Sequence, residues 1–537
     1  CEGPWGWALK GSGADAIAIS GRAESPVALV IENGSVTFHD AGPLWGMTVG
    51  QATDELEREL GAGIHVAAIG PAGERMVRYA SVLTDRCHNA FRHGHGAIMG
   101  SKNLKAVVVR GVSHPAVADP GRCRAIADSY AERMMRNQLT RWQLDPPGFG
   151  CWVHTHGTDA ALCTRNYSSS VFEGADAYAP EGFLRRAAGD SPCPGCPNDC
   201  IKRYAAPGDD PRAAGLHQEA PGTLGPNCGI DDLDTVFRAN VRCNEYGLDP
   251  VSLGFTISWA MECRERGLLA APDAPRFGDG ASLLATIDAI AARSGIGNLL
   301  AEGCARAAEA TGGGAARYAL HVKGLEIVPF EPRTQTGLAM GYAAMPVGPR
   351  YEIAEHDWDF DTRMGWPHSL DSGRTLGILR RINMDDLSPE KVRNFKALAT
   401  IWAAEDALDV CIFAGPPTRV YTMPDLAGLL EAITGWSASD WEIMRLGERR
   451  LHLMQRYNRR EGLTAAQDTL PDRFFDDPIP EGAWAGRTLD RALFGARIRL
   501  LWGMLGWDEN GAPREETLTD HGIDDASLAD LWAGGAD

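Results

Sequence analysis

The sequence lacks the features that mark membrane, nucleic-acid-binding and disulfide-stabilised proteins. It has no run of eighteen apolar residues and no signal-peptide pattern, so nothing in it predicts contact with a membrane. Its 52 basic residues are outnumbered by 71 acidic ones, and a formal net charge of −19 argues against nucleic acid as a partner. The 13 cysteines are odd in number and lack framework spacing, which predicts free or metal-bound thiols in a reducing, cytoplasmic compartment.

An initiating methionine is also missing, because the chain begins at Cys1 inside a segment that already looks structured. We therefore expect a fragment without its true N-terminus. The 537 residues present, 44% hydrophobic and 23% charged, are typical of a globular protein with two to four domains.

The order of predicted elements indicates an α+β fold. Strand patterns dominate the first part of the chain, and apolar residues at three- and four-residue steps dominate from residue 230 onward. We predict three domains: the C-terminal part of a β-rich domain at 1–115, a mainly helical domain at 116–321, and a second mainly helical domain at 322–537.

Local signals place several elements in the β-rich part. Residues 15–20 and 27–32 are predicted strands, because their apolar residues alternate or run together. The Asn33-Gly34 dipeptide predicts a hairpin turn after the second strand, since both residues tolerate positive φ angles. Residues 48–60 are predicted to form an amphipathic helix and residues 105–110 a further strand.

Three clustered cysteines form the most informative stretch. Cys193, Cys196 and Cys200 are separated by two and three residues, among Pro, Gly and Asn residues whose turns let the sulfurs converge. Soft thiolate ligands suit an iron–sulfur cluster or a zinc ion, and the spacing alone leaves both open. A fourth ligand must come from elsewhere, and Cys411 is the candidate. The alternative is three reduced cysteines in a loop.

A glycine-rich stretch over residues 92–105 suggests a site for a phosphate-bearing ligand. Gly94, Gly96 and Gly100 would let backbone amides approach the ligand closely, while Arg92 and Lys102 could pair with phosphate. The stretch does not match the dinucleotide fingerprint. The alternative is a glycine-rich turn between two elements.

Two loops combine nucleophilic and acidic side chains. Cys228 lies among Gly and Pro residues, where a lone thiol is less easily explained as core packing. Glu219 lies just upstream, and sequence alone favours a solvated surface position for its carboxylate. Residues 348–361 crowd Tyr351, His356 and several acidic groups, a density that suits either a pocket that binds or protonates substrate or an exposed acidic loop.

Two similar pieces, residues 244–249 and 406–411, each end a helix-like run with polar groups five residues apart. By themselves they would pass as two helix C-terminal caps. Their meaning depends on the order in which they follow the other motifs along the chain.

Taken together and in order, the motifs resemble the aldehyde ferredoxin oxidoreductase family of tungsten–bis-pterin enzymes. The resemblance covers essentially the whole chain. Five segments look like motifs of that family, namely 70–74, 99–106, 193–200, 247–249 and 323–326. One such match would be weak, whereas five in order at compatible spacing are specific. The resemblance implies an N-terminal β-domain that forms a base for the pterin, with two helical domains closing over it.

The resemblance also implies the cofactors and the residues that hold them. One [4Fe-4S] cluster would be ligated by Cys193, Cys196, Cys200 and Cys411. A tungsten or molybdenum bis-pyranopterin, with magnesium between the pterin phosphates as an option, would be held by Arg92, His93, Gly94, Gly96, Asn244, Asp249 and Asp406. Electrons would pass from the metal through pterin and cluster to a ferredoxin or another iron–sulfur subunit. Glu219 falls where aldehyde-oxidising members place a carboxylate near tungsten.

Several positions depart from the family pattern. Asn244 replaces an aspartate, Asp409 and Val410 replace Gly and Leu before Cys411, and Tyr351 stands about where aldehyde-oxidising members carry a histidine. An aldehyde mechanism that depends on that histidine is thus in doubt.

These departures look more like the aryl-CoA reductase branch of the family. In that branch Cys228 would complete the metal's ligand set, and an acidic residue or His356 would deliver protons to the ring. The candidate catalytic residues are therefore Glu219, Tyr351 and His356.

Two classes of function remain open at this point. The preferred one is a tungsten–pterin oxidoreductase acting on a small aldehyde, or alternatively on an aryl-CoA ester. The other is an iron–sulfur electron-transfer subunit without a catalytic metal, and a zinc-stabilised scaffold is a remote third. Assembly as a homodimer or as a hetero-oligomer is compatible with either class.

Overall fold

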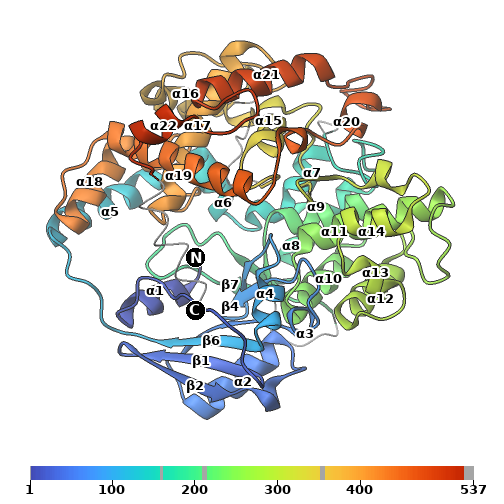
Figure 1. The fold of residues 1–537 in the computed structure, drawn as a ribbon, viewed down its shortest axis with the longest axis horizontal. Helices are drawn as coiled ribbons and strands as arrows, with labels where there is room; N and C mark the ends of the chain where they lie inside the picture. The colour runs from blue at the N-terminus through green and yellow to red at the C-terminus, as the bar shows by residue number, and fades with distance from the viewer. Residues whose placement is uncertain (1, 158–160, 208–213, 351–356, 364, 525–537) are drawn as a thin grey trace. The chain divides into compact units, whose positions relative to one another are not determined.

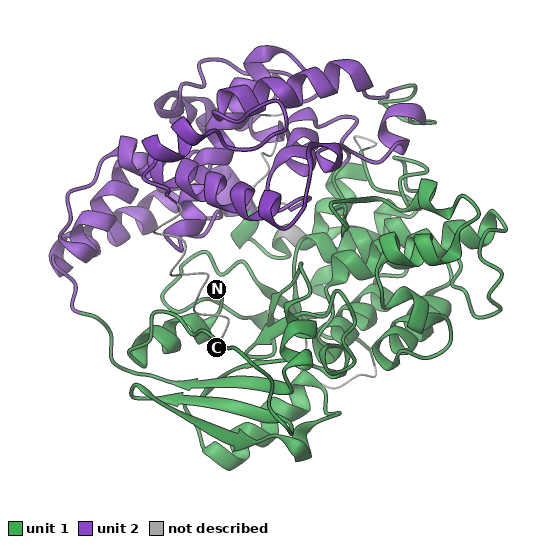
Figure 2. Cartoon of the chain, in the orientation of Figure 1, with its two compact units in different colours: residues 1–115, 143–330, 479–486 green, residues 116–142, 331–478, 487–537 purple. Residues whose placement is uncertain are grey.

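The computed structural model describes residues 2–157, 161–207, 214–350, 357–363 and 365–524. The chain divides into two compact units, coloured separately in Figure 2. Unit 1 comprises Cys1–Pro115, Gln143–Phe330 and Ile479–Gly486, and unit 2 comprises Ala116–Trp142, Glu331–Pro478 and Arg487–Asp537. The α+β prediction is confirmed, since a β-rich start precedes a mainly helical remainder. The three predicted domain boundaries stay a prediction.

A six-stranded sheet opens unit 1, in the order β2-β1-β6-β3-β4-β5 (Figure 1). Its strands are β1 Val27–Glu32, β2 Ser35–Asp40, β3 His65–Ala68, β4 Val82–Thr84, β5 His88–Ala90 and β6 Leu104–Arg110. Only β1 and β6 are parallel; the other neighbours pair antiparallel. The predicted hairpin turn between β1 and β2 is confirmed, with φ angles of 49° at Asn33 and 75° at Gly34.

Alternation along the central strand β6 gives the sheet two apolar faces. Ala106 and Val108 pack with helix α2 (Val49–Leu60) on one side, and Val107 and Val109 pack with α1 (Pro4–Gly11) on the other. Helix α2 begins where the sequence predicts, because its N-cap Thr48 accepts a hydrogen bond from Gln51 and the Gln51 side chain accepts one from the backbone of Thr48. Both sheet faces are thus covered by helices.

The predicted strand at residues 15–20 is wrong. The segment has no regular structure, and most of its residues are exposed. Both edges of β1 are already occupied, by β2 and by β6, so the alternating segment finds no partner there. A strand pattern of this kind needs a free edge, which only the folded sheet reveals.

The helical part of unit 1 follows the predicted periodicity closely. It contains α10 Leu233–Tyr246, α11 Pro250–Glu265, α12 Gly280–Ala292, α13 Ile296–Leu300 and α14 Cys304–Thr311. Every residue of α11 from Pro250 to Cys263 is buried, so this helix forms the centre of the unit. Helices α13 and α14 are separate, because Gly303, the N-cap of α14 at φ 82°, interrupts the helical periodicity between them. Short strands β7 Ala187–Asp190, β8 Lys202–Tyr204 and β9 Ala214–Leu216 form a second sheet.

Unit 2 is helical in its described part. Its longer helices are α5 Pro120–Met134, α15 Thr336–Ala344, α17 Pro389–Ala407, α18 Met423–Thr434, α19 Asp440–Arg460 and α21 Arg491–Met504. Helices α17 and α19 cross at close range, since a Cβ on Gly447 would lie 2.0 Å from the carbonyl oxygen of Thr400. No helix among the described residues is long and apolar enough to cross a membrane.

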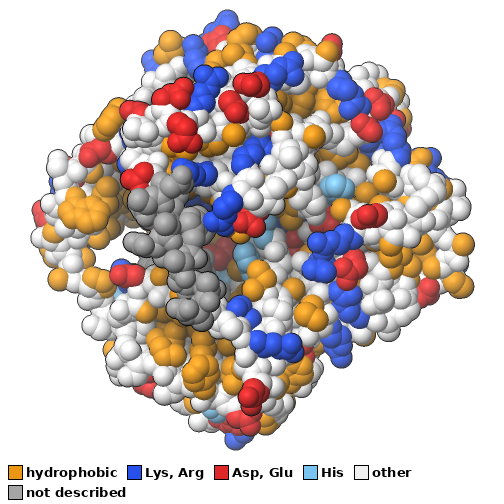
Figure 3. Space-filling view, viewed as in Figure 1, with side chains coloured by type: hydrophobic (Ala, Val, Ile, Leu, Met, Phe, Trp, Pro, Cys, Tyr) orange, Lys and Arg blue, Asp and Glu red, His pale blue; other side chains and the backbone are white. Residues whose placement is uncertain are grey.

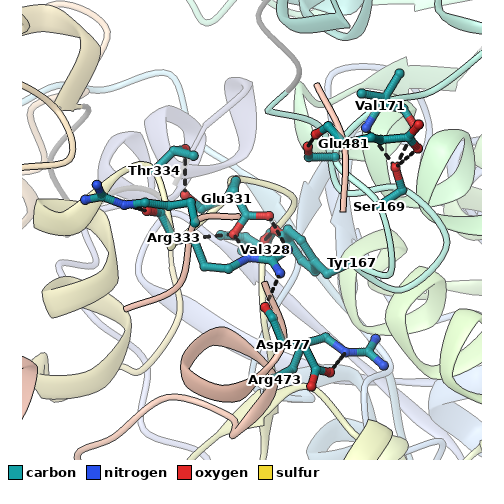
Figure 4. Close-up of polar contacts among 12 residues, drawn as sticks. Tyr167, Ser169, Val171, Val328, Glu331, Arg333, Thr334, Arg473, Asp477 and Glu481 are labelled. Carbon is teal, nitrogen blue, oxygen red and sulfur yellow. Dashed lines mark hydrogen bonds and ion pairs between the residues drawn. The ribbon is translucent and has the colours of Figure 1, made fainter. Parts of the chain in front are cut away.

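A buried ion pair fixes the segment that enters unit 2. The guanidinium of Arg333 donates to both carboxylate oxygens of Glu331 at 2.8–2.9 Å, and both side chains are almost fully buried. Arg333 also donates to the carbonyl oxygen of Asp477 at 2.9 Å, as Figure 4 shows. Separating such a pair leaves an uncompensated buried charge, so the contact strongly constrains residues 331–334.

Charged side chains of both signs are interspersed on the face drawn in Figure 3. Many of them pair at the surface, for example Arg86 with Glu57 at 3.0 Å and Arg186 with Asp234 at 2.6 Å. Exposed pairs of this kind contribute only ~0–1 kcal/mol each. The excess of acidic residues is therefore not gathered into a single acidic field on this face.

Candidate functional site

Strained backbone marks the centre of the glycine-rich stretch in unit 1. Arg92, His93 and Gly94 have φ angles of 70°, 61° and 72° in succession, between β5 and helix α4 (His95–Ser101). Two of the three residues are not glycine, and each such residue costs about 1–2 kcal/mol in the left-handed region. The conformation turns the Arg92 side chain into the protein, where it is 2% exposed, while His93 stays exposed.

The Arg92 guanidinium lies among three polar partners far away in sequence. Its Nη1 donates to the Asp249 carboxylate at 3.5 Å and to the Ser252 hydroxyl at 3.3 Å, and its Nη2 donates to the Glu326 carbonyl oxygen. Asp249 is the N-cap of α11 and accepts from the Val251 amide at 2.8 Å. Burial raises the pKa of Asp249, and the positive charge of Arg92 opposes that rise.

Contacts join the five sequence motifs in part, and two of the motifs meet directly at Arg92. Lys105 of the second motif pairs with Glu74 of the first, with 2.5 Å between Nζ and Oε1 and both side chains buried. A Cβ on Gly70 of the first motif would lie 2.3 Å from the backbone of Tyr246, which directly precedes the fourth motif. Asp249 of the fourth motif and Glu326 of the fifth both contact Arg92.

Glu326 connects this cluster to a helix start. Its carboxylate oxygen Oε1 accepts from the amide of Cys304, the first residue of α14, at 2.9 Å and from the Thr256 hydroxyl at 3.4 Å. The Glu326 carbonyl oxygen accepts from Arg92 at the same time. The buried polar cluster is thus a continuous network across α11, α14 and the glycine-rich stretch.

Gly94 and Gly96, predicted to approach a ligand, approach the protein's own backbone in this structure. A Cβ on Gly94 would lie 2.1 Å from the carbonyl oxygen of Arg78, and one on Gly96 would lie 2.4 Å from that of Ser81. The Gly96 amide already donates to the Ala80 carbonyl oxygen at 2.9 Å. Close chain packing therefore accounts for these glycines, and amide contacts from Gly96 to a phosphate find no support here.

The surroundings of Arg92 nevertheless fit a polar cofactor. Two neighbouring atoms, Ser81 Oγ and Asn89 Oδ1, are buried and have no hydrogen-bond partner among the described residues. Both belong to the same neighbourhood, because Ser81 donates its amide to Gly247 and Asn89 donates its side-chain amide to Leu248. Unsatisfied buried polar atoms are rare in native proteins and call for a partner.

The other residues predicted to bind pterin are engaged within the protein. The side-chain amide of Asn244 donates to the Gly215 carbonyl oxygen at 3.1 Å. In unit 2, Asp406 at the end of α17 forms an ion pair with Arg450 of α19. Their roles toward a pterin stay predictions.

The cysteine knuckle is a partly exposed turn of unit 1. The Cys196 amide donates to the Cys193 carbonyl oxygen at 3.0 Å, and Gly195 turns the chain at φ 71°. The Gly3 amide donates to the Cys193 sulfur at 3.2 Å, a contact that suits a sulfur carrying negative charge. Burial raises the pKa of the Cys193 thiol, and this hydrogen bond lowers it.

The cluster ligands otherwise remain a prediction. Among the described residues, no three His, Cys, Asp or Glu side chains are gathered as a ligand set. Cys411 is exposed on the loop that follows α17 in unit 2, and its sulfur accepts from the Phe413 amide at 3.4 Å. Three partly exposed thiols in one turn still have the donor chemistry of an iron–sulfur or zinc site.

Glu219 is buried, contrary to the solvated position that the sequence alone favours. It is 4% exposed and is the first residue of the short helix α9 (Glu219–Leu224), and the side-chain amide of Gln218 donates to its Oε1 at 3.5 Å. The Trp152 indole N–H donates to the carbonyl oxygen of Gln218. The surrounding fold, and not the local sequence, removes this carboxylate from water.

An aromatic wall of Trp152, His156 and Phe330 lies next to α9. No sequence motif predicted this wall. The Trp152 ring lies 5.0 Å from both the His156 and the Phe330 rings, and a Cβ on Gly222 of α9 would touch Trp152 at 2.5 Å. Burial lowers the pKa of His156 to about 3, so this imidazole is neutral. The four-residue spacing of Trp152 and His156 on one helix face is the signal that could have found the pair.

Cys228 ends the turn that directly follows α9. It is fully buried, and its thiol lies 3.4 Å from the Thr223 carbonyl oxygen, to which it donates. Burial raises the pKa of this thiol. Its predicted role as a metal ligand stays a prediction. Tyr351 and His356 lie outside the described residues.

Comparisons with known proteins agree along the whole chain. The family model "Aldehyde ferredoxin oxidoreductase, N-terminal domain" matches residues 1–111, and "Aldehyde ferredoxin oxidoreductase, domains 2 & 3" matches residues 125–523. A tungsten-containing aldehyde ferredoxin oxidoreductase of Pyrococcus horikoshii is 33% identical over 97% of this chain and 84% of its own length.

More distant relatives share the same extent. The WOR-like subunit of an aliphatic sulfonate oxidoreductase of Pyrococcus furiosus is 26% identical over 97% of this chain and 82% of its own. Among solved structures, the active-site complex BamBC of benzoyl coenzyme A reductase matches with a TM-score of 0.79 and 24% identity, covering 99% of this chain and 85% of that one. The last match shows a shared fold.

Proposed function

The chain belongs to the aldehyde ferredoxin oxidoreductase family of oxidoreductases, and from that premise we propose that it oxidises an aldehyde at a tungsten–pterin centre. The resemblance inferred from the sequence motifs, and the oxidoreductase it implies, are confirmed. The reaction converts an aldehyde and water into a carboxylic acid, two protons and two electrons. We propose that the electrons leave through a [4Fe-4S] cluster to a ferredoxin or another iron–sulfur partner.

The buried network around Arg92 is the observation that carries the proposal. A buried guanidinium paired with Asp249, beside the unsatisfied Ser81 hydroxyl and the unsatisfied Asn89 amide oxygen, is suited to hold a polar cofactor that offers both donors and acceptors. Two family motifs meet at this network through Asp249 and Glu326, and an iron–sulfur electron-transfer subunit without a catalytic metal would not need a pterin site there. Arg92 and Asp249 would therefore hold the pterin, and the tungsten bound to that pterin would be the two-electron acceptor.

Glu219 is proposed to act as a general base that accepts a proton from water or from the substrate. The Glu219 side chain is 4% exposed, and its helix α9 packs against Trp152 at Gly222, so a proton acceptor there does not compete with bulk solvent. Gln218 donates to one of its oxygens and is itself held through the Trp152 indole, so the carboxylate is oriented. The aromatic wall would exclude water beyond the reacting molecule and favour an apolar aldehyde.

A Glu219→Gln variant tests this role. It keeps the size of the side chain and its contact with Gln218 but removes the base, so kcat for aldehyde oxidation with a viologen acceptor should fall about 10²-fold or more. Tungsten and iron contents should equal those of the wild type. The control is Glu309→Gln, an exposed glutamate of α14 in the same unit, which should leave kcat unchanged. Unchanged turnover in a metal-replete Glu219→Gln variant would remove Glu219 from the mechanism.

Reduction of an aryl-CoA ester is the second candidate. Cys228 favours it, since its buried thiol follows the same short helix that begins with Glu219 and would complete a metal's ligand set in that branch. Wild-type enzyme should then reduce an aryl-CoA ester with a low-potential donor and show no aldehyde oxidation. The substrate class, magnesium, the partner subunit, the oligomeric state and a cytoplasmic location are predictions that these assays and purification would address.

A further inference from the structure

A second strained segment of unit 1 lies outside the predicted site. Arg165, Asn166 and Tyr167 have φ angles of 46°, 57° and 60°, and none of them is glycine. They form the tip of a small hairpin, which Thr164 and Ser169 close by exchanging two backbone hydrogen bonds of 3.2 Å. Three consecutive left-handed residues persist only where the surrounding structure holds them in place.

The tip of this hairpin is docked on the turn that carries Cys228. The Arg165 amide donates to the Pro226 carbonyl oxygen at 3.0 Å, and the Asn166 amide donates to the Asn227 carbonyl oxygen at 3.2 Å. The Asn227 side-chain oxygen also lies 3.2 Å from the Asn166 amide. The left-handed conformation thus points successive N–H groups at one short turn.

Side chains anchor the tip from the other side. Asn166 Nδ2 donates to the Glu262 carboxylate at 2.7 Å and to the Tyr318 carbonyl oxygen at 2.9 Å, and its Oδ1 accepts from the Ser258 hydroxyl at 3.3 Å. The Tyr167 hydroxyl donates to the Val328 carbonyl oxygen at 2.7 Å, as Figure 4 shows. Asn166 therefore links the buried helix α11 to the turn.

The same chain of contacts continues into α9. Asn227 donates its side-chain amide to Ser258 at 3.0 Å, and the neighbouring Cys228 thiol donates to the Thr223 carbonyl oxygen at 3.4 Å. The Thr223 hydroxyl donates to the carbonyl oxygen of Glu219 at 3.1 Å. A displacement at the hairpin tip would therefore reach both the thiol and the backbone that carries the Glu219 carboxylate.

We propose that residues 165–167 are a strained brace that fixes the Cys228 turn and helix α9, and that Asn166 is a positioning residue for Glu219. The first part of the proposal stands on the contacts alone, and the second rests on the proposed function. Asn166 touches no reacting atom in this scheme. It acts by holding the turn in a single conformation.

Two substitutions separate the side chain of Asn166 from its backbone angle. Asn166→Gly removes the side-chain anchors but adopts the left-handed angle freely, whereas Asn166→Ala removes the anchors and disfavours the angle. The matched control is Asn33→Ala, which imposes the same change on an exposed left-handed asparagine at φ 49° in the β1–β2 turn.

Alkylation of Cys228 in the purified holoenzyme is the primary measurement. The rate is followed with iodoacetamide under anaerobic conditions by peptide mass spectrometry. Cys243 is the internal reference, because it belongs to the same unit and is equally buried. In Asn166→Ala we expect Cys228 to react at least tenfold faster, about 1.4 kcal/mol of easier opening, while Cys243 stays within twofold. Asn166→Gly should lie between this variant and the wild type, and Asn33→Ala should change neither cysteine.

The kinetic arm tests positioning of the carboxylate. A kcat for aldehyde oxidation that falls at nearly constant KM, together with selective labelling of Cys228, supports the proposal. Equal acceleration of Cys228 and Cys243 means general destabilisation and overturns the brace. Selective labelling with unchanged kcat overturns the positioning role of Asn166. Wild-type enzyme that is inactive on aldehydes would contradict the proposed function. The brace would then be tested by the labelling rates of Cys228 and Cys243 alone.

Discussion

Replacing Arg92 by glutamine should loosen the start of helix α11 more than any surface substitution could. Arg92 and Asp249 are 2% and 1% exposed at their side chains, and the closest nitrogen–oxygen distance is 3.5 Å. Without the guanidinium, the Asp249 carboxylate keeps its hydrogen bond from the Val251 amide but loses its ion pair with Arg92. Removing one member of a buried pair costs about 3–5 kcal/mol, because the other is left uncompensated.

Hydrogen exchange at the first turn of α11 reports this loss without assuming that the whole chain unfolds in one step. A cost of 3–5 kcal/mol corresponds to exchange faster by about 10²- to 5 × 10³-fold in peptides that begin at Val251. Peptides from unit 2 should not change and serve as the internal control. The measurement needs no bound cofactor.

The double variant Arg92→Gln/Asp249→Asn tests whether loss of the Arg92–Asp249 charge pair causes the faster exchange in α11. Removing the carboxylate's charge as well should recover about 1–3 kcal/mol of the loss, because no buried ion remains without a partner. If the two single effects simply add, or if Arg92→Gln alone costs less than about 1 kcal/mol, the pair does not control this region. The argument for a cofactor-binding network at Arg92 would then fail with it.

Three further predictions concern stability. Arg333→Gln should destabilise unit 2 by about 3–5 kcal/mol in urea unfolding, since it leaves a fully buried carboxylate unpaired, and a loss below 1 kcal/mol would contradict this. Burial holds the pKa of His452 at about 4, and its Nδ1 accepts from the Trp507 indole at 2.9 Å, so only the neutral ring fits. Its contribution, about 3 kcal/mol, should be complete above pH 6.5 and be lost as the pH falls toward 4; His452→Gln should flatten this slope. Gly100→Ala should destabilise unit 1, because its Cβ would lie 1.9 Å from a carbonyl oxygen of α3 (Pro71–Glu74), whereas Gly503→Ala, a helical glycine with open space, should raise the melting temperature slightly.

Local chemistry allowed the sequence to predict many elements before any tertiary contact was known. The Asn33-Gly34 turn and the amphipathic helix predicted over residues 48–60 depend on φ preferences and apolar spacing within a few residues, and both are confirmed. The helices over 233–246 and 250–265 follow from the spacing of apolar residues. The family followed from the order of five short motifs.

Residues 15–20 and Glu219 show where sequence patterns are insufficient. The first segment has a strand pattern but no strand edge to join, and the second is a carboxylate that looked solvated in a loop and is buried at a helix start. Burial depends on what packs against a residue from elsewhere in the chain. A few neighbours in sequence do not specify it.

Fold class, family and the residue types available for chemistry can be inferred from the order of amino acids. The folded chain is needed to show that Arg92 meets Asp249, 157 positions away, that Gly94 and Gly96 face backbone, and that Asn166 contacts Glu262 of α11. The difference lies in the range of the interactions. Turn and helix preferences act over a few residues, whereas burial, buried ion pairs and raised pKa values arise from contacts between distant segments, which exist only after the chain has folded.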